Sequence, residues 1–184
     1  MIVTVNGKDF EIVPNANLFG ANLTGANFSG ANLTGVIFTD ADLTDTIFDT
    51  FELINVKFFN ANLTNANFSS SDLSGLDFRY ANLTNANLSH CDLSNSYFDL
   101  ADLTDIDLHD ADLHDADFSG ANLTRANLIG ADLTRANLTG ANLTGANLIH
   151  ANMCNAIFLD NLKNANMTCA RNYKVFDWET YYNV

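Results

Sequence analysis

A five-residue repeat constrains the fold of this chain more than any other feature of its sequence. A Leu, Phe or Met stands at every fifth position from Leu18 to Phe158, and the residue two places earlier is usually Ala. Side chains five apart would step about 140° around an α-helix and would point to opposite faces of a plain strand. Each repeat instead predicts one short extended side, with its large side chain and its Ala pointing inward, followed by a corner of turn-forming residues.

The number of sides in each coil can be read from every fourth repeat. One such column contains only Leu at the large position, and each Leu has Ala two places before it and Thr directly after it. A neighbouring column is mostly Phe, whereas grouping the repeats by three mixes Leu with Phe. A four-sided coil of about 20 residues therefore fits best, and stacked coils bury their apolar edges against one another. The all-Leu column is Leu23, Leu43, Leu63, Leu83, Leu103, Leu123 and Leu143.

The repeat resembles the Ala-(Asp/Asn)-Leu-X-X motif of the pentapeptide-repeat family, as in Ala121-Asn122-Leu123-Thr124-Arg125. This resemblance implies an all-β fold, a right-handed quadrilateral parallel β-helix (solenoid). We expect about seven coils of about 20 residues, stacked about 4.8 Å apart. The predicted domains are an N-terminal hairpin cap over residues 1–14, the pentapeptide-repeat β-helix over 15–170 and a C-terminal aromatic cap over 171–184.

The N-terminal cap is predicted from Asn6-Gly7, a strong signal for a two-residue hairpin turn. Pairing Val5 with Lys8 and Val3 with Phe10 puts Val3, Val5 and Phe10 on one face. We expect that face to cover the first coil, because the end of a solenoid exposes both core and unpaired backbone.

Charge and composition exclude several classes of partner. The net charge of −14 argues against binding to nucleic acid or to an anionic membrane surface. No apolar run approaches the length of a membrane span, and the N-terminus lacks the order of a signal peptide. The three cysteines do not suggest a disulfide framework. We therefore expect a cytoplasmic protein with no nucleic-acid or membrane partner.

We expect no enzyme, no cofactor and no metal. The sequence contains no phosphate-binding Gly-rich loop, Cys-x-x-Cys or His-Glu-x-x-His motif, and a regular rod offers no cleft. In stacked coils His90 would lie one coil from Asp110 and beside His109, so a transition-metal site is one alternative. Solvated surface histidines are favoured, because nothing in the sequence supplies the outer hydrogen bonds that orient metal-binding histidines.

The first candidate surface is acidic. The residue before each large apolar residue points outward, and in one column five acids follow one another about 4.8 Å apart. Further acids encircle the rod between residues 99 and 117. The family resemblance implies one use, because some pentapeptide-repeat proteins imitate duplex DNA and act on type II topoisomerases such as DNA gyrase. The alternative is that Asp and Asn only keep the rod soluble. The candidates are Glu52, Asp72, Asp92, Asp112, Asp132, Asp102, Asp105, Asp107, Asp115 and Asp117.

The second candidate surface is apolar. Exposed apolar groups along one side suggest a protein-binding face, with scattered surface residues as the alternative. Its residues are Phe19, Phe59, Tyr80, Tyr97 and Leu100.

The C-terminal aromatic residues predict either a cap or a homodimer contact; they are Phe176, Trp178, Tyr181 and Tyr182. Our main functional prediction is a rigid, non-catalytic scaffold that binds an unidentified protein. The alternative is a DNA-mimicking inhibitor or protector of a type II topoisomerase.

Overall fold

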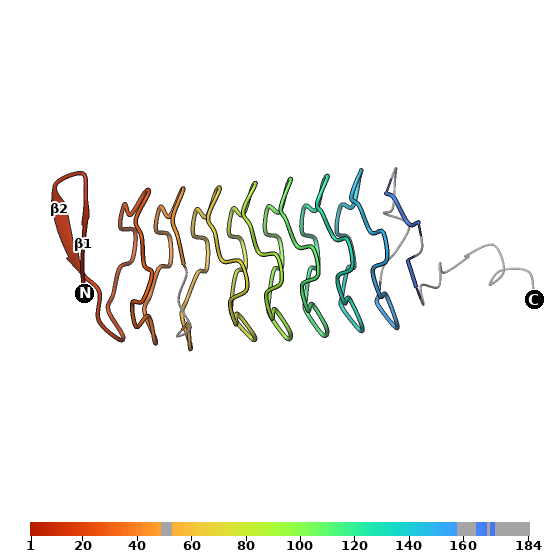
Figure 1. Cartoon of the computed structure of the whole chain (residues 1–184), viewed down its shortest axis with the longest axis horizontal. Helices are drawn as coiled ribbons and strands as arrows, with labels where there is room; N and C mark the ends of the chain where they lie inside the picture. The colour runs from red at the N-terminus through yellow and green to blue at the C-terminus, as the bar shows by residue number, and fades with distance from the viewer. Residues whose placement is uncertain (49–52, 158–164, 169, 172–184) are drawn as a thin grey trace, which may run out of the picture.

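The chain folds as a right-handed quadrilateral β-helix, which confirms the architecture predicted from the repeat. A computed structural model describes residues 1–48, 53–157, 165–168 and 170–171. The coils stack side by side along one axis, with a hairpin at the N-terminal end (Figure 1). Beyond Arg171, the predicted C-terminal cap lies outside the described residues. The part of the chain that the structure describes contains no helix that could cross a bilayer.

The N-terminal hairpin consists of β1 (Ile2–Val5) and β2 (Lys8–Glu11), paired antiparallel. Val3 lies opposite Phe10 and Val5 opposite Lys8, as expected. Asn6 and Gly7 both have positive φ, which a two-residue hairpin turn of type I′ requires. Val3, Val5 and Phe10 are buried in the same apolar cluster as the coils, so the hairpin extends the core at this end.

Parallel backbone pairing between residues 20 apart joins successive coils as far as Ile157, for example Asn62 to Asn82 and Asp92 to Asp112. The coil of 20 residues is therefore present in the structure. The last described pairs, Asn147 to Asn166 and Asn152 to Arg171, are 19 apart. Each side contributes only one bridged residue before the chain turns, so the coils form ladders without long strands. Because the pairing repeats on every side, the extended backbone of an inner coil forms hydrogen bonds with both the preceding and the following coil.

The core is a set of stacked side-chain columns. The central residue of each repeat, meaning the Leu, Phe or Met at every fifth position, is buried throughout the described coils. Two columns on opposite sides of the coil carry stacked Phe rings, and rings of these two columns meet edge to face across the core. The small residue two places earlier is also buried in most repeats, which allows four sides to close around so narrow an interior.

Candidate protein-binding surface

Each repeat ends in a corner with a specific backbone conformation. The residue two places after the central residue, here called the corner residue, has positive φ in every described repeat. The N–H of the next residue donates to the carbonyl of the central residue, as from Ala26 to Leu23 at 2.9 Å. Positive φ at the third residue of such a turn suits Gly, Asn and Asp. The residue types at these positions predict a turn, but the positive φ of the corner residue is seen only in the structure.

Two large apolar residues occupy corner positions despite this preference. Tyr80 and Leu100 have φ of 61° and 57°. A left-handed conformation costs an ordinary L-residue roughly 1–2 kcal/mol. Both side chains are also largely in solvent, with 50% of Tyr80 and 56% of Leu100 exposed. Their presence is therefore explained neither by the turn nor by the core.

Phe59, Tyr80 and Leu100 come from three successive coils and form the surface that we call the apolar corner. The Phe59 and Tyr80 rings have centroids 5.3 Å apart, and the guanidinium of Arg79 lies over Phe59 at 5.8 Å from the ring centroid. Leu100 lies against the backbone of the next corner, where a Cβ on Gly120 would come within 2.6 Å of the Leu100 Cδ2 atom. Glycine at this position therefore leaves room for Leu100.

The two carboxylates beside the apolar corner, Asp77 and Asp99, differ in how completely they are hydrogen-bonded. Arg79 donates two hydrogen bonds of 2.8 Å to the carboxylate of Asp77, and these lower the pKa of Asp77. Asp99 lies with Arg79, Tyr80 and Leu100 in the lining of a shallow hollow. Its Oδ2 atom is buried and has no hydrogen-bond partner among the described residues. A buried, unpaired carboxylate oxygen is costly, so this hollow favours a hydrogen-bond donor.

The other predicted apolar residues do not join this cluster. Phe19 is exposed, but it lies two coils from Phe59 with Thr39 between them in the same column. Tyr97 is exposed on the extended part of the same side, before the corner. Its bridged neighbours in the adjacent coils are Asp77 and Asp117. The structure thus places three of the five predicted residues in one patch and two outside it.

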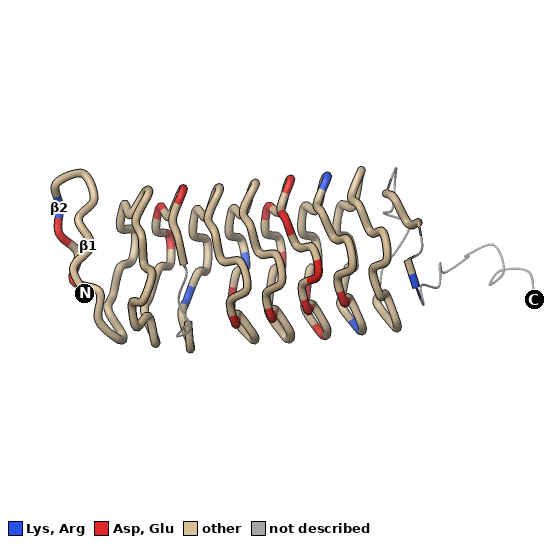
Figure 2. The backbone as a smooth tube through the Cα atoms, viewed as in Figure 1, with Lys and Arg blue, Asp and Glu red and all other residues tan. Residues whose placement is uncertain are grey.

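The predicted acidic column forms a continuous ladder over four coils. Asp72, Asp92, Asp112 and Asp132 are bridged in succession, and we call them the acidic ladder. Glu52, the fifth predicted acid of this column, lies outside the described residues. Acidic positions recur along the rod and are densest around residues 99–117 (Figure 2).

The outward Asp and Asn residues also hold the turns, a role that the sequence analysis missed. Oδ1 of Asp72 accepts the backbone N–H of Ser74 at 3.0 Å, and Asn82 does the same for Thr84. This is an Asx turn, which the frequency of Asn and Asp at this position would have suggested. Because the side-chain oxygen of Asn serves as well as that of Asp, the turn does not explain the charge of the acidic ladder.

The remaining predicted acids do not make a single surface. Asp102, Asp107 and Asp117 lie on three different sides of the coil that also contains Asp112. Asp105 and Asp115 are corner residues, and each binds the arginine one coil further on, Arg125 and Arg135 respectively. The hydrogen bonds from these arginines lower the pKa of both carboxyl groups. Exposed ion pairs of this kind contribute little to stability, because water and salt screen them.

The two described cysteines, Cys91 and Cys154, differ in burial. Cys91 is buried, and burial raises the pKa of its thiol to about 11, so it is not an activated nucleophile. Cys154 is half-buried, and its thiol is free. The predicted dimer contact at Phe176, Trp178, Tyr181 and Tyr182 lies outside the described residues.

Comparison with known proteins places the chain in a family. The family model described as pentapeptide repeats matches residues 15–49, 52–89, 86–125 and 121–158, in eight copies. No curated protein sequence matches the chain.

Several solved structures are similar. HetL, a pentapeptide repeat protein involved in heterocyst differentiation regulation from the cyanobacterium Nostoc sp. strain PCC 7120, is 27% identical over 86% of this chain and 83% of that one, with a TM-score of 0.37. Full-length QnrB1, a plasmid-mediated fluoroquinolone resistance protein, is 16% identical over 92% and 93%, with a TM-score of 0.45. A pentapeptide repeat protein of the Arabidopsis thaliana thylakoid lumen is 33% identical over 56% and 68%, with a TM-score of 0.37. The family-model match extends over most of the chain, which therefore belongs to the pentapeptide-repeat family.

Proposed function

We propose that this protein is a non-catalytic scaffold that binds a partner protein through the apolar corner. The observation that carries the proposal is the conformation of Tyr80 and Leu100. Both are large, apolar and exposed, and both stand at positive φ where Asn or Gly would be less strained. Backbone strain of this kind concentrates at functional sites, and aromatic residues are frequent anchors of interfaces.

The chemistry around the apolar corner favours a basic, partly apolar segment of the partner. Asp99 lines the hollow together with Tyr80 and Leu100, and its buried Oδ2 atom has no hydrogen-bond partner among the described residues. Lys and Arg combine an apolar stem, which can pack on these two side chains, with a donor that can reach Asp99. The net charge of −14 would attract such a partner from a distance.

Site-specific photo-crosslinking tests this proposal. A photoreactive phenylalanine analogue at position 80 should capture a protein in the native cells, whereas the same analogue at position 85 should not. Asn85 is the matched control because it is an exposed corner residue with φ of 57° on the next edge of the rod. Leu100→Asn and Asp99→Asn should each abolish the adduct at position 80. Equal capture at both positions, or capture that survives both substitutions, would remove the apolar corner as the binding surface.

The acidic ladder favours a second candidate function, the imitation of DNA. Asn would hold the turns as well as Asp, and the all-Leu column on the opposite side mostly carries Asn at this position, yet the ladder has four successive acids. One charge per rung of about 4.8 Å is about a third of the density of duplex DNA, which carries one per about 1.7 Å. A DNA-binding groove would therefore have to engage acids of other sides as well. For this reason we place this function second.

A gyrase supercoiling assay distinguishes the two functions. A DNA mimic should inhibit supercoiling or reduce drug-induced cleavage as the protein is titrated, and the effect should fall steeply with salt. The quadruple variant D72N/D92N/D112N/D132N should lose the effect while keeping its turns. Asn122→Asp, on another side, provides a control that adds charge outside the ladder. An effect that the quadruple variant retains in full would exclude the ladder as the mimic.

A further inference from the structure

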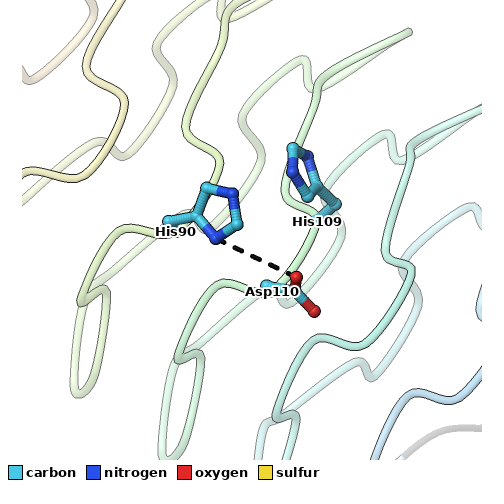
Figure 3. A group of neighbouring side chains, drawn as sticks. All are labelled: His90, His109 and Asp110. Atoms are coloured by element: carbon cyan, nitrogen blue, oxygen red, sulfur yellow. Dashed lines mark ion pairs between the residues drawn. The ribbon is translucent and has the colours of Figure 1, made fainter.

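Two histidines and an aspartate from neighbouring coils meet at the corner that leads into the acidic ladder. His90 and Asp110 are corner residues of successive coils, and His109 directly precedes Asp110 (Figure 3). One ring nitrogen from each histidine and one carboxylate oxygen all lie within 4.8 Å of one another. His90 Nδ1 is 3.9 Å from Asp110 Oδ2, and the two imidazole centroids are 4.5 Å apart.

Asp107 orients the ring of His109. The Nδ1 atom of His109 lies 2.9 Å from Asp107 Oδ1. A carboxylate can only accept, so this contact places the proton on Nδ1 and leaves Nε2 with a free lone pair. Metal-binding histidines usually donate their other ring nitrogen to a carboxylate in this way. The sequence alone does not indicate such a group, whereas the structure provides one in Asp107.

Asp107 is itself held in place. Besides the ring of His109, its Oδ1 accepts the backbone N–H of His109 at 3.2 Å and the side-chain amide of Asn127, one coil away, at 2.9 Å. The same carboxylate therefore closes the turn and fixes the histidine. A ring orientation determined by the turn costs no further ordering when a ligand binds.

The backbones of the three residues are fixed relative to one another. The N–H of His90 donates to the carbonyl of His109 at 3.0 Å, which joins the two coils at the site itself. A metal bound through bonds of about 2.1 Å needs ligand atoms roughly 3.4 Å apart. The His90–Asp110 separation of 3.9 Å exceeds this value by about 0.5 Å and the other separations exceed it by at most about 1.4 Å. Rotation of the exposed side chains of His90 and Asp110 can close these gaps.

We propose that His90, His109 and Asp110 bind one first-row divalent transition metal, with Zn²⁺ as the reference ion. Two imidazole nitrogens and one carboxylate oxygen suit Zn²⁺, Cu²⁺ or Ni²⁺ better than the all-oxygen sites preferred by Mg²⁺ and Ca²⁺. The carboxylates around the site add favourable electrostatic energy for a cation. Since the site joins two coils, the bound ion would cross-link them, and the remaining coordination positions would face solvent and be filled by water.

Calorimetric titration of the untagged full chain with ZnCl₂ tests the proposal. Wild type should show a site that His90→Asn weakens at least about tenfold. His150→Asn is the matched control, because His150 is also an exposed corner residue, with φ of 62°, on the same edge of the rod. Asn is natural at corners, so both variants should fold. Thiol sites such as Cys154 are common to all variants and cancel in the comparison.

A second pair of variants tests the role of His109 and its carboxylate. His109→Ser should abolish the site, whereas His114→Ser should not, although His114 makes the same local contact with its own aspartate, Asp112. Ser already occupies the position of His109 in other coils, so the fold is not at risk. Asp107→Asn keeps the turn and should weaken Zn²⁺ binding about 10–100-fold.

The ring nitrogens supply an independent readout. In nitrogen-detected NMR of the histidines, Zn²⁺ should shift the Nε2 resonance of His109 while its Nδ1 stays protonated. The proposal is overturned if Zn²⁺ does not bind, if His90→Asn and wild type bind equally, or if the ion displaces the proton from Nδ1 of His109. Equal weakening by His150→Asn would likewise show that binding is not at this site.

Discussion

At the scale of single residues, the corner position separates residues that serve the fold from residues that serve something else. Asn65, Asn85 and Asn95 adopt positive φ there, a conformation that Asn tolerates well. Tyr80 and Leu100 adopt it at an energetic cost. A position that recurs in every repeat thus provides its own reference, against which an unusual side chain can be recognised.

We predict that Leu100→Asn stabilises the protein. Asn relieves the strain at φ of 57°, and the half-exposed Leu loses little burial, so the free energy of unfolding should rise on the order of 1 kcal/mol. Urea denaturation followed by circular dichroism measures the change, and Asn85→Leu is the reverse control, which should destabilise. A clear loss of stability in Leu100→Asn would mean that its contact over Gly120 outweighs the strain.

The pKa of His114, which contacts Asp112 of the acidic ladder, should lie above the ordinary value of a histidine. Asp112 Oδ1 lies 2.7 Å from His114 Nδ1, and this hydrogen bond is the main cause that raises the pKa of His114 above 6.5. A pKa raised in the folded state stabilises the fold fully below the unfolded pKa, and this contribution is lost as the pH rises through the folded pKa.

Asp112→Asn tests this assignment. The variant keeps the backbone turn and should lower the pKa of His114 towards 6.5, measured by NMR titration of the ring protons. An unchanged His114 curve would assign the shift to Asp115 or to other neighbouring charges.

At the scale of the structural element, the stacked columns determine where the rod is most cohesive. One column contains parallel Phe rings from Phe38 to Phe118, with centroids 4.8–5.5 Å apart. The column on the opposite side of the coil carries Phe28, Phe48 and Phe68 and then continues as Leu. The N-terminal coils therefore have an aromatic core and the C-terminal coils an aliphatic one.

We predict that Phe78→Leu destabilises the protein more than Phe118→Leu. Phe78 contacts the rings of Phe58, Phe68 and Phe98, whereas Phe118 contacts only Phe98 among the described rings. Each aromatic pair contributes about 0.5–1.5 kcal/mol beyond the area that it buries. The free energies of unfolding in urea should therefore differ by about 1–3 kcal/mol. Equal losses would indicate that ring stacking adds nothing to burial in this core.

At the scale of the whole molecule, the charge distribution opposes the compact state. The 22 Asp and Glu exceed the 8 Lys and Arg, so a net charge of −14 remains after the arginines of the described ion pairs, Arg79, Arg125 and Arg135, are counted. Rungs of the acidic ladder lie about 4.8 Å apart, well within the screening length of about 10 Å at 0.1 M salt. The free protein therefore retains repulsion that a basic partner would relieve.

We predict that salt stabilises the protein. Raising NaCl from 10 to 500 mM should increase Tm, because like-charge repulsion along the rod is screened. The quadruple ladder variant D72N/D92N/D112N/D132N should start from a higher Tm and respond less. For a chain of this size about 1 kcal/mol corresponds to about 2–4 °C. A Tm that falls with salt would show that the arginine ion pairs dominate instead.

The architecture was predictable from sequence because it follows from a single requirement. Large apolar side chains at every fifth position can be buried together only if the chain turns within each repeat, and the all-Leu column from Leu23 to Leu143 indicates the length of the coil. The hairpin was predictable for a similarly local reason, the turn at Asn6-Gly7. The acidic ladder was predictable from the same coil period, because residues 20 apart lie in one column.

Contacts between outward side chains were only partly predictable from the sequence. The coil period predicted which residues are neighbours, such as His90 and Asp110, because backbone pairing is periodic. Only the tertiary structure decided that Asp107 orients His109, that Leu100 lies over Gly120 and that Phe59 meets Tyr80 across two coils. Outward side chains are not constrained by the core, so their directions depend on corner conformation and on neighbours in the next coil, which a linear pattern of residues does not contain.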